Sequence, residues 1–324
     1  MKTSIRYLLY VLGGFAVCLA GLLFYLNVML PNVGPAPDIT VELRPEKIER
    51  GHYLANNVML CMDCHSQRDF SLFTGPPKPE TDGAGGEVFD QSMGLPGRFI
   101  SRNLTPTALG DWTDGEIFRA ITTGVSKDGT ALFPIMPYPS YGQLDEADIR
   151  AVIAYLRTLD PVDNELPASH PDFPVNILIN TMPRKANLQP APPKSDRLAY
   201  GKYLVTAAAC NDCHTRHEKG KFVGEPFAGN AEFLFPDGSV SRSANITSHE
   251  TGIGLWTKEM FVDRFKSYNE PDYIPHRVNP GDYQTVMPWM MYARMDREDL
   301  EAIYDYLMSI PPVATEHELF TVAQ

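Results

Sequence analysis

Two short stretches place cysteine and histidine at a spacing that suits redox or metal chemistry. Residues 61–65 read CMDCH and residues 210–214 read CNDCH. In each stretch two residues separate the thiols, and an imidazole follows the second thiol directly. The remaining cysteine, Cys18, lies in an apolar run, and we interpret it as a small apolar residue.

The Cys-x-x-Cys-His pattern is the attachment signature of c-type haem. Each sulfur can form a thioether with a vinyl group of the porphyrin, and the adjacent imidazole can ligate the iron. A thioredoxin-like pair would need a βαβ setting, which is not visible here. A zinc site or a plain disulfide would leave the histidines without a function. We therefore expect two covalently attached haem c groups, held by Cys61, Cys64 and His65 and by Cys210, Cys213 and His214.

The sixth ligand of each iron decides between electron transfer and catalysis at an open site. Met136 and Met287 each precede a proline shortly before the last helix of their half, and we predict that they are the axial ligands. The rival ligands are Met93 for the first site and Met290, Met291, His249 and His276 for the second. Methionine and histidine together raise the reduction potential relative to two histidines, which suits electron transfer.

The chain reads as a tandem duplication, because anchor points recur in the same order. Loop lengths differ between the copies, but the order holds throughout. Besides the two cysteine motifs, the matching pairs are residues 51–54 with 201–204, Asn103-Leu104-Thr105 with Asn245-Ile246-Thr247, Trp112-Thr113 with Trp256-Thr257, Met136-Pro137 with Met287-Pro288, Asp145 with Asp296, Asp148 with Asp299, and Tyr155-Leu156 with Tyr306-Leu307.

Helices should position these motifs in both halves. We predict a helix that runs up to each cysteine motif, from about Glu46 and from about Ser195. Terminal helices should begin at Asp145 and Asp296 and stop at the prolines that follow. A shorter helix should follow each Trp-Thr pair, capped by Thr113 and by Thr257. Gly- and Pro-rich loops fill the rest and no run of alternating strands is visible, so the expected fold class is mainly α.

The N-terminal run from Tyr7 to Leu30 holds no charged residue. At ~1.5 Å per residue, it is long enough to cross a ~30 Å hydrocarbon core. A cleaved signal peptide is the alternative, but such peptides have a shorter apolar core and a cleavage site that is not evident here. Lys2 and Arg6 precede the run, so we expect a single-pass anchor in the bacterial inner membrane, with the body on the periplasmic side.

Two Pro-rich stretches, for which we expect little regular secondary structure, divide the rest of the chain. We expect a transmembrane anchor (1–30), a Pro-rich spacer (31–44), a first domain (45–160), a linker (161–194) and a second domain (195–324). Within the linker, residues 171–184 (PDFPVNILINTMPR) should dock as a short helix across both domains.

Composition narrows the classes of partner. The net charge is −12 and no long Lys/Arg patch occurs, so nucleic-acid binding is not expected. An acidic surface favours a redox partner with a basic docking face. Lipid contact is expected through residues 7–30.

Further residues near the motifs are weaker candidates. Trp112 and Trp256 could pack on each haem or bond a propionate, or could simply fill the core. Asn103 with Thr105, and their counterparts in the second half, should fix the loop backbone or line the haem pocket. Arginines that could neutralise propionates are Arg98, Arg102 and Arg242.

With both Cys-x-x-Cys-His motifs, N-[LI]-T, G-x-W-T and M-P in this order, the chain resembles membrane-anchored dihaem class I c-type cytochromes. It is similar to the cytochrome c subunits that serve membrane-bound dehydrogenases, over roughly residues 45–160 and 195–312. The resemblance implies two tandem class I cytochrome c domains, with iron held by His65 and Met136 and by His214 and Met287. The chain carries two motifs where alcohol and gluconate dehydrogenase subunits carry three, and reads MPWMM where an aromatic M-P-Y turn is usual.

The resemblance implies an electron-transfer protein rather than an enzyme. Its partners would be a membrane dehydrogenase or quinol-oxidising complex and an acceptor such as an oxidase. The alternative is a dihaem enzyme of the cytochrome c peroxidase type, which needs one haem open to peroxide. A structural subunit of a respiratory supercomplex, with haems that still conduct, is the third possibility.

Overall fold

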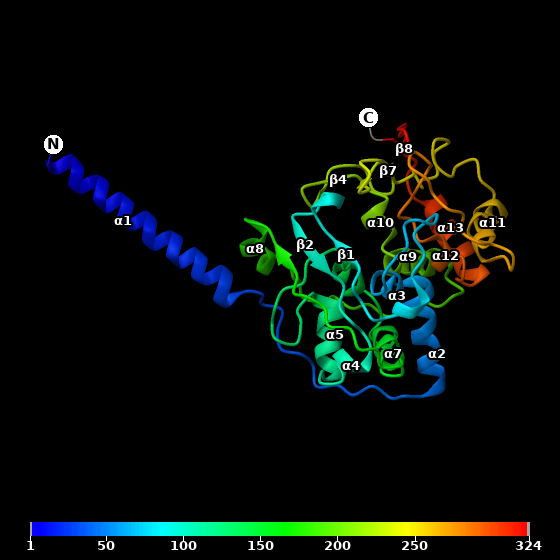
Figure 1. Cartoon of the computed structure of the whole chain (residues 1–324), viewed down its shortest axis with the longest axis horizontal. Coiled ribbons are helices and arrows are strands. Elements are labelled where there is room, and N and C mark those ends of the chain that lie inside the picture. Colours follow the sequence, from blue (N-terminus) through cyan, green and yellow to red (C-terminus); the bar gives the residue numbers. More distant parts are fainter. Residues whose placement is uncertain (1, 323–324) are drawn as a thin grey trace.

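The computed structural model describes residues 2–322 and begins with a long helix that extends away from the rest of the chain (Figure 1). Helix α1 (Lys2–Phe24) continues into one π-helical turn, η1 (Tyr25–Met29). By length and apolar composition, Thr3–Met29 is the one helix in residues 2–322 able to cross a membrane, and none of its most apolar window is buried. An anchor and a signal sequence both meet this criterion.

Two helical halves follow this N-terminal helix. The first half contains α2 (Pro45–Tyr53), which continues as the π-helical turn η2 (Leu54–Val58), then α3 (Cys61–Cys64), α4 (Pro106–Leu109), α5 (Asp114–Thr123), α6 (Tyr138–Tyr141) and α7 (Glu146–Leu156). The second half contains α9 (Arg197–Ala207), α10 (Cys210–Cys213), α11 (Lys258–Lys266), α12 (Trp289–Tyr292) and α13 (Arg297–Ser309). Short 3-10 turns are η3 (Pro79–Thr81), η4 (Gln91–Met93) and η6 (Ser267–Asn269).

The expected helix starts are confirmed, most of them with side-chain caps. Thr113 accepts a hydrogen bond from the backbone of Glu116, whose carboxylate accepts one from the backbone of Thr113, so α5 begins with a capping box. Thr257 caps α11 and Asp145 caps α7 in the ordinary way, through a backbone N–H of the first turn. Asp296 precedes α13 without such a bond.

The first and last helices of each half cross in close contact. α2 packs on α7, and α9 packs on α13 in the same way. A Cβ atom added to Gly51 would lie 1.9 Å from the carbonyl oxygen of Ala151, and one added to Gly201 would lie 2.0 Å from that of Ala302. Glycine is therefore required at both crossings, because any side chain would push the two backbones apart.

Small antiparallel sheets accompany the helices, which the sequence pattern did not predict. The sheet of the first half is β1 (Val88–Phe89), β2 (Gly97–Ile100) and β3 (His170–Pro171), and that of the second is β6 (Glu232–Leu234), β7 (Val240–Arg242) and β8 (Phe320–Thr321). β4 (His217–Glu218) and β5 (Lys221–Phe222) form a separate pair. In both three-stranded sheets the last strand comes from the segment after the terminal helix, so the duplication includes the sheets.

Equivalent residues join the two halves through reciprocal contacts. Tyr53 donates a hydrogen bond to Asp299 (2.8 Å), and its counterpart Tyr203 donates one to Asp148 (2.6 Å). In the same manner α6 lies on α9 while α12 lies on η2. When residue i of one half contacts residue j of the other, and the reverse contact also occurs, the two halves are related by a twofold axis. Here this axis relates two halves of one chain. One continuous apolar cluster, the main cluster, takes buried residues from both halves.

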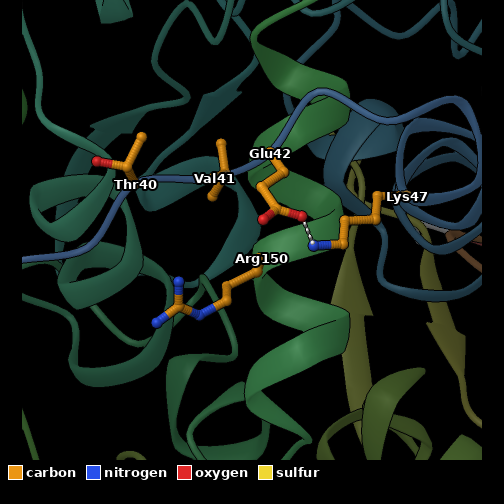
Figure 2. A pocket seen from close by; sticks show the side chains of 5 residues that line it. All are labelled: Thr40, Val41, Glu42, Lys47 and Arg150. Atoms are coloured by element: carbon orange, nitrogen blue, oxygen red, sulfur yellow. Dashed lines mark hydrogen bonds and ion pairs between the residues drawn. The ribbon is translucent and has the colours of Figure 1, made fainter.

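The Pro-rich spacer (31–44) lies along the first half. The backbone N–H of Val41 donates to Asp114 (2.7 Å), and Glu42 forms an ion pair with Lys47 (2.7 Å). A hollow of about 100 Å³ lies beneath this stretch (Figure 2). Its lining residues are Thr40, Val41, Glu42, Lys47 and Arg150. No residue of the cysteine motifs lines this hollow, so it is not a haem site.

The linker segment 171–184 forms a short helix, but its position differs from the expected one. It contains α8 (Val175–Leu178) and the 3-10 turn η5 (Ile179–Thr181), which both contact η1 at the end of the N-terminal helix. The side chain of Asn180 donates to the carbonyl oxygen of Leu26 (3.0 Å). The segment thus meets the last turn of the N-terminal helix, a contact that the repeated motifs of the two halves do not indicate.

Candidate haem sites

Each Cys-x-x-Cys-His motif forms one helical turn directly after a residue in the left-handed conformation. Leu60 (φ 59°) precedes α3, and Ala209 (φ 51°) precedes α10. This conformation costs a residue with a Cβ atom roughly 1–2 kcal/mol, and it occurs at the same point in both halves. It ends the long helix and starts the short turn that carries both cysteines.

Both motif histidines make the same hydrogen bond. His65 Nδ1 lies 2.7 Å from the carbonyl oxygen of Arg102, and His214 Nδ1 lies 2.8 Å from that of Ala244. Because a carbonyl only accepts, Nδ1 carries the proton and Nε2 is left for a metal. Burial lowers the pKa of both histidines, although the hydrogen bond opposes it. Each imidazole is therefore held neutral, the state in which histidine binds iron.

The Asn-x-Thr motif fixes the loop that supplies this carbonyl group. The Asn103 side chain accepts hydrogen bonds from the backbone and hydroxyl of Thr105 (2.8 and 2.7 Å) and donates to the carbonyl oxygen of Val162 (2.8 Å). The second half repeats all three bonds with Asn245, Thr247 and Val313. The prediction that these residues fix the loop backbone is confirmed.

No disulfide joins the four motif cysteines. Burial raises the pKa of Cys61, Cys210 and Cys213 to about 12, and it also raises the pKa of Cys64. A structural zinc site needs thiolates, which this environment disfavours. Moreover, within residues 2–322 no three His, Cys, Asp or Glu side chains are grouped to hold a metal ion. The donor set therefore fits two thioether bonds and one histidine better than zinc.

Met136 and Met287 lie in equivalent turns beside these motifs. In each turn the methionine carbonyl accepts a hydrogen bond from the residue after the proline, at 2.7 Å and 2.8 Å. Both side chains are half-buried and pack against the main cluster, which Cys61 and Cys210 also contact. The structure thus brings one methionine of each half and that half's cysteine motif to the same apolar cluster.

A tyrosine ties each methionine turn to the helix before the motif. The hydroxyl of Tyr141 donates to the carbonyl oxygen of Met59, and that of Tyr292 donates to the carbonyl oxygen of Ala208 (2.8 Å). These bonds hold the two sides of each site together. Both tyrosines stand at matching positions in the sequence, but no motif marks them.

The rival ligands lie in other surroundings. Met93 is in η4, which contacts β6, and Met290 packs against a separate cluster around Phe73 and Tyr268. Met291 is buried in the main cluster. Met287 therefore matches Met136 more closely than Met290 does.

Neither rival histidine repeats the arrangement of the motif histidines. His249 Nδ1 accepts a hydrogen bond from the backbone of Thr251 (3.1 Å), so Nε2 carries the proton in the neutral ring. The ring of His276 stacks on Phe73, with 4.8 Å between centroids.

A loop of the first half supports the methionine turn of the second. Thr74 has no equivalent residue in the second half. Its backbone N–H donates to the side chain of Gln284 (2.8 Å), and its hydroxyl donates to the carbonyl oxygen of Met287. Gln284 also donates to the carbonyl oxygen of Leu72 (2.9 Å). These residues carry no repeat signal, because the equivalent loop after the second motif, between His214 and Gly229, is shorter than that between His65 and Gly85.

An almost fully buried ion pair lies at the base of the same loop. Arg68 and Asp63, which lies between the two cysteines of the first motif, approach to 3.3 Å. Arg68 also donates to the carbonyl oxygens of Gly75 (2.7 Å) and Thr74 (2.6 Å). It thereby holds the loop against the first motif.

The tryptophans and arginines that we expected near the haems lie in different surroundings. Trp112 and Trp256 pack against the main cluster. Arg242 is paired with Glu232 (2.9 Å), which leaves it less available to a propionate. Arg102 donates to the carbonyl oxygen of Pro167 (3.1 Å) and Arg98 is exposed.

Comparison with known proteins agrees with the motifs. The chain is 28% identical over 294 residues to an alcohol dehydrogenase (quinone) cytochrome c subunit of Gluconacetobacter polyoxogenes, covering 85% of this chain and 58% of the relative. It is 29% identical over 301 residues to the fructose dehydrogenase cytochrome subunit of Gluconobacter japonicus, covering 89% and 57%. A diheme cytochrome c-type protein of Cereibacter sphaeroides is 28% identical over 167 residues, covering 48% and 53%. No family model matches the chain.

The resemblance to cytochrome c subunits of membrane-bound dehydrogenases is thus confirmed. The chain spans less than three fifths of the length of the first two relatives.

Proposed function

We propose that this chain is a dihaem c-type cytochrome that carries electrons from a membrane dehydrogenase or quinol-oxidising complex to an acceptor such as an oxidase. The proposal depends mainly on the repetition of a whole site. In both halves a one-turn Cys-x-x-Cys-His helix, a histidine fixed through Nδ1 and a Met-Pro turn meet at the main cluster. Haem supplies reversible one-electron iron chemistry, while the protein holds it, orients it and excludes water.

In this proposal the first site, in residues 45–160, uses Cys61, Cys64, His65 and Met136. The second site, in residues 195–324, uses Cys210, Cys213, His214 and Met287. Two protein ligands leave no open position on the iron for a substrate. The ligand set therefore favours electron transfer over catalysis.

A dehydrogenase is the proposed electron donor, because relatives named as cytochrome subunits of alcohol and fructose dehydrogenases cover most of this chain. The N-terminal helix supports attachment to the bacterial inner membrane. Lys2 and Arg6 before the apolar run support a periplasmic body.

Purification from the native host in mild detergent, followed by redox titration, tests this function. We expect two haems that titrate reversibly and a co-purifying dehydrogenase whose substrate reduces them. The proposed electron donor would be contradicted if the haems stayed oxidised when the substrate of each co-purifying enzyme was added.

The peroxidase alternative requires an iron with an open position. Two equivalent methionine turns argue against such a site. We therefore expect no peroxide turnover above that of free haem when the reduced protein is mixed with hydrogen peroxide. Turnover at an enzymatic rate would favour the alternative.

A further inference from the structure

We propose that residues 173–181 form a second membrane contact, which lies in the boundary between lipid headgroups and acyl chains beside the N-terminal anchor. This surface lies outside the apolar span itself. The proposal concerns the anchor and the linker only, so it stands or fails independently of the haems.

The segment has an exposed apolar face where it meets the anchor. Phe173 is 79% exposed and Leu178 is 43% exposed. α8 and η5 both contact η1, and Asn180 donates to the carbonyl oxygen of Leu26, so the exposed face is continuous with the apolar surface of the last anchor turn. Figure 1 shows α8 beside the inner end of α1. Both ends of the segment are tied to the first half, through β3 on β2 and through the backbone of Arg184 to Thr123 (3.2 Å).

The length of the anchor sets the depth of this contact. Thr3–Met29 has 27 residues. At ~1.5 Å per residue it is about 40 Å long, which exceeds the ~30 Å hydrocarbon core. The last turn therefore reaches the interface, and a segment packed on it lies at the same level. Interfacial helices bury their apolar face by about 5–10 Å at this level.

Charge also favours a lipid surface as the occupant. The chain as a whole has a net charge of −12, but residues 173–195 contain neither Asp nor Glu. Arg184 and Lys185, which follow the apolar face, are exposed. Two cations next to apolar side chains favour a surface with anionic headgroups, which the acidic remainder of the chain does not. The contact would hold the first half against the membrane and leave the second half farther away (Figure 1).

Photocrosslinking of the full-length protein in vesicles of phosphatidylethanolamine and phosphatidylglycerol tests the proposal. The photoreactive residue benzoylphenylalanine replaces Phe173 in one variant. It replaces Ile274, which is 82% exposed in the second half, in a matched control. A third variant with the same residue at Leu12 reports lipid contact within the span.

We expect lipid adducts at position 173 in a yield similar to that at position 12, and none at position 274, measured by mass spectrometry. Adducts at position 12 without adducts at position 173 would overturn the proposal. Crosslinks from position 173 to a second copy or to another protein would also overturn it. The same holds if the mature protein lacks position 12, because the N-terminal helix would then have been removed.

Discussion

At the scale of single residues, the nature of the sixth iron ligand decides the function. The structure holds His65 and His214 neutral, with Nε2 free, by one hydrogen bond each. It places Met136 and Met287 in matching turns at the main cluster. A thioether ligand stabilises reduced iron and raises the potential, so removal of either methionine should have a measurable spectroscopic effect.

Met136→Leu should abolish the axial ligand of the first site only. We expect the weak charge-transfer band at the red end of the visible spectrum to fall to half its intensity, because one of the two haems loses its methionine. In a redox titration that haem should have a lower reduction potential. Met93→Leu is the matched control and should leave both spectrum and potential unchanged. An unaltered spectrum in Met136→Leu would show that another residue ligates the first iron.

Met287→Leu and Met290→Leu separate the two ligand candidates of the second site. Met287 shares the main cluster with Cys210, whereas Met290 packs in the cluster around Phe73. We therefore expect Met287→Leu to change the spectrum and potential of the second haem, and Met290→Leu to leave them unchanged. The reverse pattern would assign Met290 as the ligand.

The sequence predicted the repeated part of each site and none of the unrepeated part. Cysteine motif, histidine, Asn-x-Thr and Met-Pro all recur, so comparison of the two copies reveals them. Thr74 and Gln284 bond across the two halves, and Arg68 holds the loop that carries Thr74. A contact between residues more than 200 positions apart leaves no periodic signal.

At the scale of elements, helices were predictable because their starts have local chemical signals. Thr113, Asp145 and Thr257 cap helices where the sequence indicated. The small sheets were not predictable, since strands of two to four residues are too short to show alternation. Their third strands also arrive from distant segments after the terminal helices.

Gly51→Ala and Gly201→Ala should each destabilise the helix crossing of one half. The added methyl group would meet a carbonyl oxygen at 1.9 Å or 2.0 Å, so the two backbones must separate. We expect a loss of about 1–3 kcal/mol or more in the free energy of unfolding, measured by denaturant unfolding followed through haem absorbance. Lys202→Ala, at an exposed position of the same helix, is the control. Wild-type stability in both glycine variants would contradict the close crossing.

At the scale of the whole molecule, the reciprocal contacts make the halves one pseudo-symmetric body. Tyr53 and Tyr203 cross between the halves to Asp299 and Asp148. Burial and the nearby carboxylate both raise the pKa of each tyrosine, so the hydroxyls remain donors near neutral pH. The duplication was visible in the sequence, but the axis that relates the copies depends on contacts between them.

Tyr53→Phe and Tyr203→Phe should each weaken the contact between the halves. Each loses the hydrogen bond that its hydroxyl donates to a carboxylate and the one that it accepts from the backbone of Asp296 (3.1 Å) or Asp145 (3.2 Å). We therefore expect a loss of about 1.5–3 kcal/mol in the free energy of unfolding, nearly additive in the double variant. Tyr273→Phe is the control, since its buried hydroxyl has no hydrogen-bond partner within residues 2–322. A double variant as stable as the control would argue against the reciprocal interface.

The central claim is that the polypeptide holds a covalently bound haem at each of its two cysteine motifs. Intact mass spectrometry of the protein matured in its own host, followed by peptide mapping, measures this directly. We predict a mass increased by two haem groups, with one on the Cys61–Cys64 peptide and one on the Cys210–Cys213 peptide. The mass of the bare polypeptide, or a single adduct, would contradict the account.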